Sequence, residues 1–316
     1  MRFTSITLNP AIDRIEYLDT LTENGLNRPT RTQIKAGGKG INVARTIGML
    51  KDREGDRETV VTAITTAGGY AGEELKALLE NEEFYLKVIP TRFETRQALK
   101  LVTKSGTTEI NETGKIEKEA LYTLVEILAD QIADGEKTVV ILSGSFPKVE
   151  NFDADPFYVE TGKSFPQDVE KNVENSLITL LESCGIPVIV DTSGESLVES
   201  LKASPSLIKP NQTELEALYG APLDDEKKLV DFCRELYVDN GCEILCTRGE
   251  NGAIFVGKEG IFKKDSHRVF PCDPTGAGDT YLAAFLYARY QKRLSIDQCL
   301  SYADGITREY LENSLT

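Results

Sequence analysis

Residues 272–280 read CDPTGAGDT and lead directly into an apolar run, residues 281–290, which read YLAAFLYARY. Gly276 and Gly278 lack side chains, which suits a backbone that turns tightly and approaches another group closely. The apolar run predicts a buried helix. A glycine turn that enters a helix presents unpaired N–H groups and the positive end of the helix dipole, which favour a bound phosphate. Asp279 adds a carboxylate at that helix start, although a first-turn acid that merely stabilises the helix explains it equally well.

The composition describes a chain with a sizeable core and an acidic surface. It has 316 residues, of which 40% are hydrophobic, enough for one large domain or two ordinary ones. The formal net charge, 36 minus 51, is −15, which argues against nucleic acid and anionic membranes as partners. A small phosphorylated ligand needs only a local basic pocket. The sequence has no charged leader and no apolar run approaching about 18 residues, so we expect a cytoplasmic protein.

The cysteine and histidine content restricts the chemistry. The six cysteines form no C-x-x-C pair, and His267 is the only histidine. These counts argue against a zinc site and against Ser-His-Asp or Cys-His catalysis. Catalysis would then depend on carboxylates, lysines or arginines, and backbone amides.

Near the N-terminus, two stretches place polar residues where a ligand can bind. Residues 2–8 predict a strand that Pro10 ends, so Asp13 lies just beyond a strand end, the edge at which open α/β sheets bind ligands. Residues 37–45, GGKGINVAR, predict a glycine turn that opens a helix. This is not a Walker loop, because glycine follows Lys39, and not G-x-G-x-x-G, because Val43 replaces the third glycine.

Further along, predicted strands alternate with predicted helices, which indicates a mainly parallel, doubly wound sheet. Five motifs then follow one another in an order that resembles the ribokinase-like (PfkB) family of carbohydrate kinases. They are GGKGINVA at 37–44, SGSFP at 143–147, KPNQTE at 209–214, TRGENG at 247–252 and TGAGD at 275–279. The resemblance implies one kinase domain over residues 1–316, helices on both sides of the sheet, and a small β-sheet lid from segments near 12–17, 30–35 and 88–112.

The resemblance also implies a reaction that uses ATP and Mg²⁺. Asp279 would be the catalytic base, and the amides of Gly276, Ala277 and Gly278 would form an anion hole. Glu214 would approach Mg²⁺ through water, although Asn211 and Glu214 are equally explained as an N-cap and its N3 partner. The nucleotide-binding residues implied in this way are Lys209, Asn211, Thr247, Gly249, Gly252 and Thr275.

Within the family, Thr95-Arg96 followed by TTEINE at 107–112 most resembles the 1-phosphofructokinase branch. That branch implies fructose 1-phosphate as substrate and fructose 1,6-bisphosphate as product; tagatose 6-phosphate and fructose 6-phosphate are the alternatives. Asp13 and Asn42 would hold sugar hydroxyls beside Gly37 and Gly38. The cations expected to hold the phosphate already on the sugar are Arg28, Lys39, Arg96 and Lys100.

Some features leave alternatives open. A sugar-phosphate sensor without activity could use the same fold, and the lid could form a homodimer. An NAD oxidoreductase is less well supported, because the dinucleotide fingerprint is missing. Residues 148–166 are longer and more acidic than the family pattern and predict an inserted surface loop. The predicted C-terminal helix, residues 294–316, ends earlier than that pattern, which leaves the adenine-side wall undefined.

Overall fold

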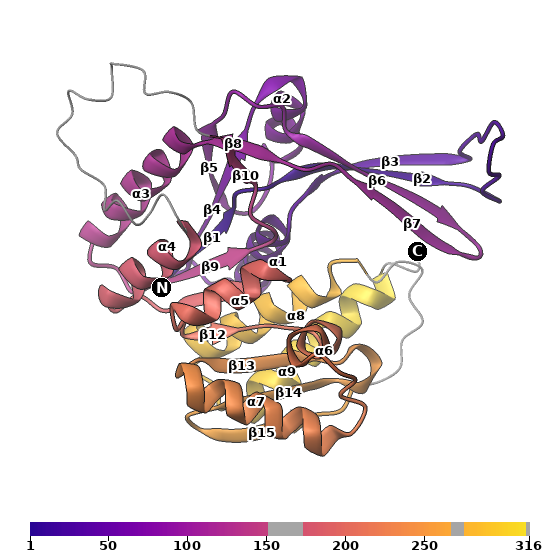
Figure 1. Ribbon diagram of the computed structural model, residues 1–316. Coiled ribbons are helices and arrows are strands. Elements are labelled where there is room, and N and C mark those ends of the chain that lie inside the picture. Colours follow the sequence, from indigo (N-terminus) through magenta and orange to yellow (C-terminus); the bar gives the residue numbers. More distant parts are fainter. Residues whose placement is uncertain (151–172, 267–274, 314–316) are drawn as a thin grey trace.

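A nine-stranded sheet forms the centre of the protein (Figure 1), in a computed structural model that describes residues 1–150, 173–266 and 275–313. The strand order is β15-β14-β13-β12-β11-β9-β1-β4-β5. The neighbours from β13 to β5 pair in parallel, and the β14–β15 hairpin extends the β13 edge antiparallel. The expected mainly parallel, doubly wound sheet is confirmed. Its strands are β1 Arg2–Thr7, β4 Val60–Ala67, β5 Tyr85–Pro90, β9 Thr138–Ser143, β11 Val188–Asp191, β12 Leu207–Ile208, β13 Glu243–Thr247, β14 Ala253–Gly257 and β15 Gly260–Lys264.

Helices cover both faces of this sheet, because alternate strand residues are apolar on each side. Phe3 of β1 points into one core with α1, α8 and α9, whereas Ile6 points into the other with the helices from α3 to α7. In the described residues no helix has both the length and the apolar character needed to cross a membrane. The helices are α1 Lys39–Arg53, α2 Gly69–Leu78, α3 Lys118–Ala133, α4 Val173–Ser183, α5 Glu195–Lys202, α6 Gln212–Tyr219, α7 Glu226–Asn240, α8 Ala277–Leu286 and α9 Ile296–Asn313, with short helices at Gly249–Asn251 and Tyr287–Gln291.

A second, four-stranded sheet projects from the body as a long ribbon (Figure 1). Its order is β3-β2-β6-β7, with β2 and β6 parallel and the outer pairs antiparallel. The expected small sheet is confirmed, and its service as a lid stays a prediction. Its strands are β2 Ala11–Tyr17, β3 Arg31–Gly37, β6 Arg96–Thr103 and β7 Gly106–Asn111.

Several element boundaries differ from the sequence-based expectation. The segment near 88–112 was predicted to belong to the lid. For the part up to Pro90 this prediction is wrong, because β5 pairs with β4 in the main sheet. The predicted insertion loop 148–166 begins instead with a short strand, β10 Lys148–Glu150, paired with β8 Lys115–Glu117. Residues 151–166 of that loop lie outside the described residues. Helix α8 begins at Ala277, before the apolar run, so that Asp279 lies in its first turn.

The parallel strands determine where the site lies. From β1 the chain crosses to β4 on one side and later to β9 on the other, so the strand order reverses between β1 and β9. Open α/β sheets bind ligands beyond the carboxyl ends of the strands at such a point. The strand-end residues Thr7, Ser143 and Asp191 lie at that edge, on neighbouring strands.

Candidate active site

The first turn of α8 forms the centre of the site. Gly276 is its N-cap with φ 85°, a left-handed conformation that L-residues rarely adopt, and a Cβ there would lie 2.8 Å from the Tyr310 hydroxyl. The first helical N–H to be paired is that of Thr280, which donates to the Gly276 carbonyl. The preceding N–H groups of the first turn have no intrahelical partner, so they can bind an anion.

Asp279 is buried in this turn and is only 7% exposed. Its Oδ2 accepts a hydrogen bond from Nδ2 of Asn42 on α1 at 2.8 Å. Burial raises the pKa of Asp279 to about 6, and the negative charge of Asp191 adds to the rise, against the Asn42 hydrogen bond and the charges of Lys209 and Lys39. The carboxylate is therefore a proton acceptor whose pKa lies near neutral pH, as general base catalysis requires.

Two lysines meet at a buried carboxylate beside Asp279. Asp191 Oδ1, at the end of β11, lies 3.1 Å from Nζ of Lys39 and 3.3 Å from Nζ of Lys209. Burial alone would lower the pKa of Lys39, but Asp191 and the neighbouring carboxylates outweigh it and raise that pKa. The Lys39 ammonium group therefore stays charged, within one site that also contains Lys209 and the free N–H groups of α8.

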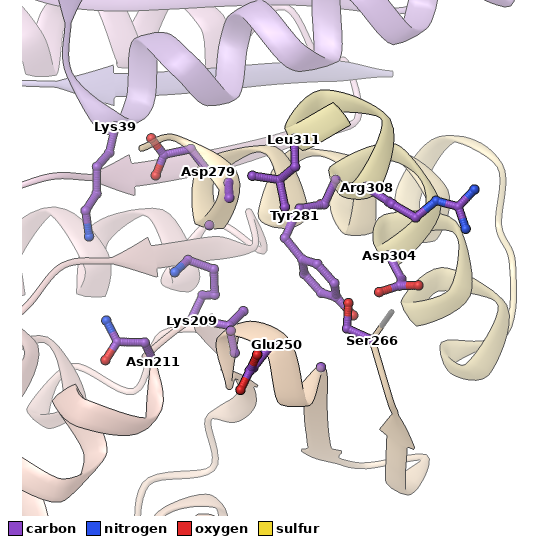
Figure 2. A pocket seen from close by; sticks show the side chains of 16 residues that line it. Lys39, Lys209, Asn211, Glu250, Ser266, Asp279, Tyr281, Asp304, Arg308 and Leu311 are labelled. Atoms are coloured by element: carbon purple, nitrogen blue, oxygen red, sulfur yellow. The ribbon is translucent and has the colours of Figure 1, made fainter. Parts of the chain in front are cut away.

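A cavity of about 490 Å³ extends from these charges (Figure 2), a size that suits a nucleotide-sized ligand. In Figure 2, Lys39, Asp279 and Lys209 lie at one end, and Tyr281 and Asp304 lie toward the other. The α9 residues on its wall, Asp304, Thr307, Arg308 and Leu311, supply the side that the sequence left undefined. The predicted site residues that line the cavity are Lys39, Lys209, Asn211, Thr247, Gly249, Gly252, Ala277, Gly278 and Asp279. Lys39 was expected beside the phosphate of the sugar, and it lies here with the residues expected at the nucleotide because Asp191 pairs it with Lys209. Thr275 lies beside it, with its carbonyl bonded by Tyr310 at 2.7 Å.

Asn211 and Glu214 form the capping box of α6, so the structural explanation of this pair is confirmed. Asn211 Oδ1 accepts from the Glu214 N–H, and Glu214 Oε2 accepts from the Asn211 N–H, each at 2.8 Å. The cap uses one oxygen of Glu214 and leaves Oε1 as an acceptor. In the described residues no group of three or more His, Cys, Asp or Glu could hold a metal ion. This donor set suits Mg²⁺ that arrives with nucleotide phosphates and keeps its waters, rather than an ion caged by protein.

A second group of predicted residues lies on one face of the small sheet. Asp13 of β2 pairs in register with Ala98 of β6, so Asp13, Arg96 and Lys100 share a face. Lys100 Nζ lies 4.0 Å from Asp13 and 3.9 Å from Glu109, and its side chain is only 9% exposed. Lys100 therefore lies within ion-pair distance of two carboxylates, and its binding of a phosphate stays a prediction. A Cβ on Gly37 would lie 2.3 Å from Asp13 Oδ1, so a side chain there would displace the Asp13 carboxylate.

Arg96 lies where the two sheets meet. Its Nε donates to the carbonyl of Asn9 at 3.3 Å, and the Asn9 side chain donates to Ser145 Oγ at 2.8 Å. No hydrogen bond or ion pair joins its two terminal nitrogens to any other residue of the described part of the chain. Burial lowers the pKa of Arg96, and the Asp13 charge opposes this. Arg96 is therefore joined through Asn9, which follows β1, to the Ser145 hydroxyl, which follows β9.

Arg28 is not brought to this site. It lies in the loop that joins Tyr17 of β2 to Arg31 of β3, at the far tip of the ribbon (Figure 1). The six steps from Arg31 to Gly37 span about 20 Å of extended strand. Within one chain, Arg28 is therefore too distant to bind the same phosphate as Arg96. The expectation that these two arginines act together is wrong for one chain, because the strand register separates them.

Comparison with known proteins agrees with this geometry. The model of the pfkB family carbohydrate kinases matches residues 6–306. The chain belongs to the pfkB family of carbohydrate kinases. It is 30% identical to a 1-phosphofructokinase of Borreliella burgdorferi over 90% of this chain and 83% of the relative, and 29% identical to that of Bacillus subtilis over 96% and 89%. A crystal structure of Escherichia coli phosphofructokinase-2 in complex with substrates and products superimposes with a TM-score of 0.80 at 25% identity, over 98% of this chain and 93% of that one.

Sequence reasoning about this kinase missed two residues. Asp191 ends a predicted buried strand, and its position at the carboxyl end of a parallel strand was the available signal. Ser145 lies in the SGSFP motif but had no role, because only the fold brings it to Asn9 and Arg96.

Proposed function

We propose that this pfkB kinase transfers the γ-phosphoryl group of ATP to a hydroxyl of fructose 1-phosphate and so forms fructose 1,6-bisphosphate. The observation that carries the proposal is the placement of the buried Asp279 carboxylate in the first turn of α8, among free N–H groups and beside Lys39 and Lys209. The relatives named 1-phosphofructokinase support this choice of sugar.

The nucleotide would occupy the cavity between α8, α9 and the Gly249–Gly252 turn. Lys39 and Lys209 supply positive charge at the end of the cavity where Asp279 lies, so the nucleotide phosphates would bind at that end. The adenine ring would then lie toward Tyr281. Gly252 has φ 82°, and a Cβ would lie 1.8 Å from the Lys264 carbonyl, so the turn can keep its shape only with glycine. When bound, Mg²⁺ would neutralise phosphate charge, with Glu214 Oε1 as its water-mediated contact in this chain.

The sugar phosphate would lie between the small sheet and the strand ends of β1 and β9. Arg96 has its two terminal nitrogens available for bidentate binding of the phosphate, with Ser145 beside it. Asp13, held by Lys100, would accept hydrogen bonds from sugar hydroxyls. In this arrangement the acceptor hydroxyl approaches Asp279 from the lid side and the nucleotide from the cavity side.

In the proposed step, the sugar hydroxyl oxygen forms a bond to the γ-phosphorus while the bond to the ADP oxygen breaks. Asp279 accepts the hydroxyl proton, and the N–H groups at the start of α8 stabilise the charge on the transferred group. Positioning and charge stabilisation supply most of the rate, since phosphoryl transfer requires little from the base.

We also propose that a second copy of the chain covers the opposite face of the ribbon. Arg14, Leu99 and Ile110 align across β2, β6 and β7, on the face away from Asp13. This face is open and mixes apolar with charged side chains, with Ile110 at 55% and Ile34 at 38% exposure, and it contains a hollow of about 570 Å³. A homodimer through the lid would bury it and leave the Asp13 face to the substrate.

The test is a turnover screen with ATP against fructose 1-phosphate, fructose 6-phosphate, tagatose 6-phosphate and free fructose, with ADP release as the readout. Fructose 1-phosphate should exceed free fructose in kcat/KM by at least about 10³, because the analogue without a phosphate leaves the half-buried Arg96 unpaired. If another phosphorylated ketose gives a higher kcat/KM, the proposed substrate is wrong, but the proposed chemistry of phosphoryl transfer still holds. Binding of sugar phosphates without ADP release would favour the sensor instead.

A further inference from the structure

A chain of side-chain contacts leads from the protein surface to Asp279. Glu82 Oε1 accepts from Nε of Arg45 at 2.8 Å and lies 2.6 Å from NH2 of the same guanidinium. NH1 of Arg45 donates to Oδ1 of Asn42 at 2.8 Å, and Nδ2 of Asn42 donates to Asp279 at 2.8 Å. The contacts join the turn before β5, two successive turns of α1, and the first turn of α8.

The contact with Arg45 decides which way round the Asn42 amide lies. A guanidinium carries only donors, so the Asn42 atom that faces it must be the carbonyl oxygen. The amide nitrogen is then left for Asp279, to which it donates. The ionised Asp279 carboxylate also requires the amide nitrogen, but the protonated acid can donate its O–H to the amide oxygen. Without Arg45, the amide can therefore turn over when Asp279 is neutral, and the neutral form is stabilised.

Arg45 is itself held in place by packing as well as by charge. It forms the two-pronged contact with Glu82, whose side chain is 19% exposed, and a planar fork of this kind fixes the guanidinium orientation. The turn that carries Glu82 packs directly on α1, since a Cβ on Gly48 would lie 2.4 Å from the Glu83 carbonyl. Glu82 therefore stays within reach of Arg45.

We propose that Arg45, anchored by Glu82, is a positioning residue that keeps the Asn42 amide donating to Asp279, so that the base stays ionised and aimed at the acceptor hydroxyl. Arg45 does this without touching Asp279 or lining the nucleotide cavity. The inference rests on the proposed role of Asp279 as the base and deepens it.

The sign of the expected pH effect follows from the groups that face Asp279. Lys39 and Asn42 face it from α1, Asp191 from β11, and Lys209 from the turn after β12; Asp191 raises its pKa, and the other three lower it. An amide turned over would present its carbonyl oxygen, which accepts a hydrogen bond from the O–H of the neutral acid and disfavours the carboxylate. Loss of Arg45 should therefore move the acidic limb of kcat to higher pH.

The experiment compares Arg45→Met with the wild type by steady-state kinetics across pH, with fructose 1-phosphate and ATP. We expect kcat to fall at least about tenfold, the scale of a lost outer hydrogen-bond partner. We also expect the acidic limb of the kcat–pH profile to move to higher pH. The KM for ATP should stay within about twofold. Arg45→Lys, which restores a donor, should recover most of kcat and return the limb toward the wild-type pH.

Arg53→Met is the matched control. Arg53 lies on the same helix and pairs with Glu309 at 2.7 Å, so its loss removes a similar ion pair that does not lead to Asp279. It should leave kcat and the limb unchanged. If ionisation of the sugar phosphate set the acidic limb of the kcat–pH profile, that limb would lie at the same pH in every variant, against the inference.

Wild-type kcat and an unmoved limb in Arg45→Met would overturn the inference. Should that variant fail to fold, Glu82→Gln keeps a hydrogen-bond acceptor for Arg45 but removes the charge, and a smaller shift in the same direction is expected; no shift would overturn it equally. The proposed function fails separately. If Asp279→Asn retains turnover, the base is wrong, whereas an inactive Asp279→Asn beside an unaltered Arg45→Met refutes only the positioning role.

Discussion

Replacing Asp279 by asparagine should make the protein more stable while it abolishes most of its activity. The side chain is 7% exposed, and burial raises the pKa of its carboxyl from 3.8 to about 6. A carboxyl group with a raised pKa contributes stability below its unfolded value and loses it as pH rises through the folded value. The ionised base therefore destabilises the fold at neutral pH, and the neutral amide does not.

The size of this effect follows from the pKa. Each tenfold change in proton affinity corresponds to about 1.4 kcal/mol, so a rise from 3.8 to about 6 amounts to about 3 kcal/mol at pH 8. At pH 4 the group is almost wholly protonated in the folded protein, and the difference falls below about 1 kcal/mol. Turnover should meanwhile fall by about two to four orders of magnitude, the usual contribution of a general base.

Urea unfolding of both proteins at pH 8 and pH 4 measures the stability, and ADP release measures the turnover. Asp297→Asn is the matched control, because Asp297 is also a first-turn acid, on α9, but is exposed. There the amide should cost a few tenths of a kcal/mol, as the lost interaction of an acid with a helix dipole does. At pH 8, Asp279→Asn should thus raise the free energy of unfolding, whereas Asp297→Asn should lower it.

Two results would refute the reasoning. If Asp279→Asn lowers the free energy of unfolding at pH 8, as Asp297→Asn does, Asp279 merely stabilises its helix. If the variant keeps more than a tenth of wild-type turnover, with chemistry shown to limit the rate, Asp279 is not the base. A gain in stability that is equally large at pH 4 would show that the buried carboxylate is not its cause.

Two further predictions concern the small sheet. Arg96→Ala should weaken the binding of fructose 1-phosphate by about 2–3 kcal/mol, the value of lost charge-assisted hydrogen bonds, and so raise the KM for this substrate. The KM for ATP should stay unchanged, and equal weakening of both substrates would indicate a defect in folding. Ile110→Glu should place charge beside the exposed Ile34 and Ile110 and convert the proposed dimer to monomers in sedimentation velocity, whereas Tyr70→Glu, at a residue 93% exposed on α2, should not. A wild-type protein that sediments as a monomer would contradict the lid dimer.

Much of this architecture could be predicted from local sequence. The alternation of strands and helices gave the parallel sheet, and the glycines at 276 and 278 marked a turn into a buried helix. The errors came where local pattern carries no information on partners. Tyr85–Pro90 has the composition of a strand, but only its pairing with β4 assigns it to the main sheet instead of the lid.

The site was predictable as a set of residues but not as an arrangement. Sequence alone identified Asp279, Lys39 and Lys209, because glycine turns, strand ends and motif order mark them. It did not distinguish Lys100, which lies within ion-pair distance of Asp13 and Glu109, from Arg96, whose terminal nitrogens have no partner among the described residues. The availability of a charge depends on which carboxylates fold against it, and those lie on other strands.

The sequence by itself therefore predicted the fold class, from the alternation of strands and helices, and the glycine turn with Asp279 at a helix start, from residues within a few positions of one another. Only the tertiary structure decided that Asp191 joins Lys39 to Lys209, and that Arg45 reaches Asp279 through Asn42. It also separated Arg28 from the other cations by the length of β3. The physical reason is that desolvation, ion pairing and donor orientation depend on distances between residues that are far apart in the chain.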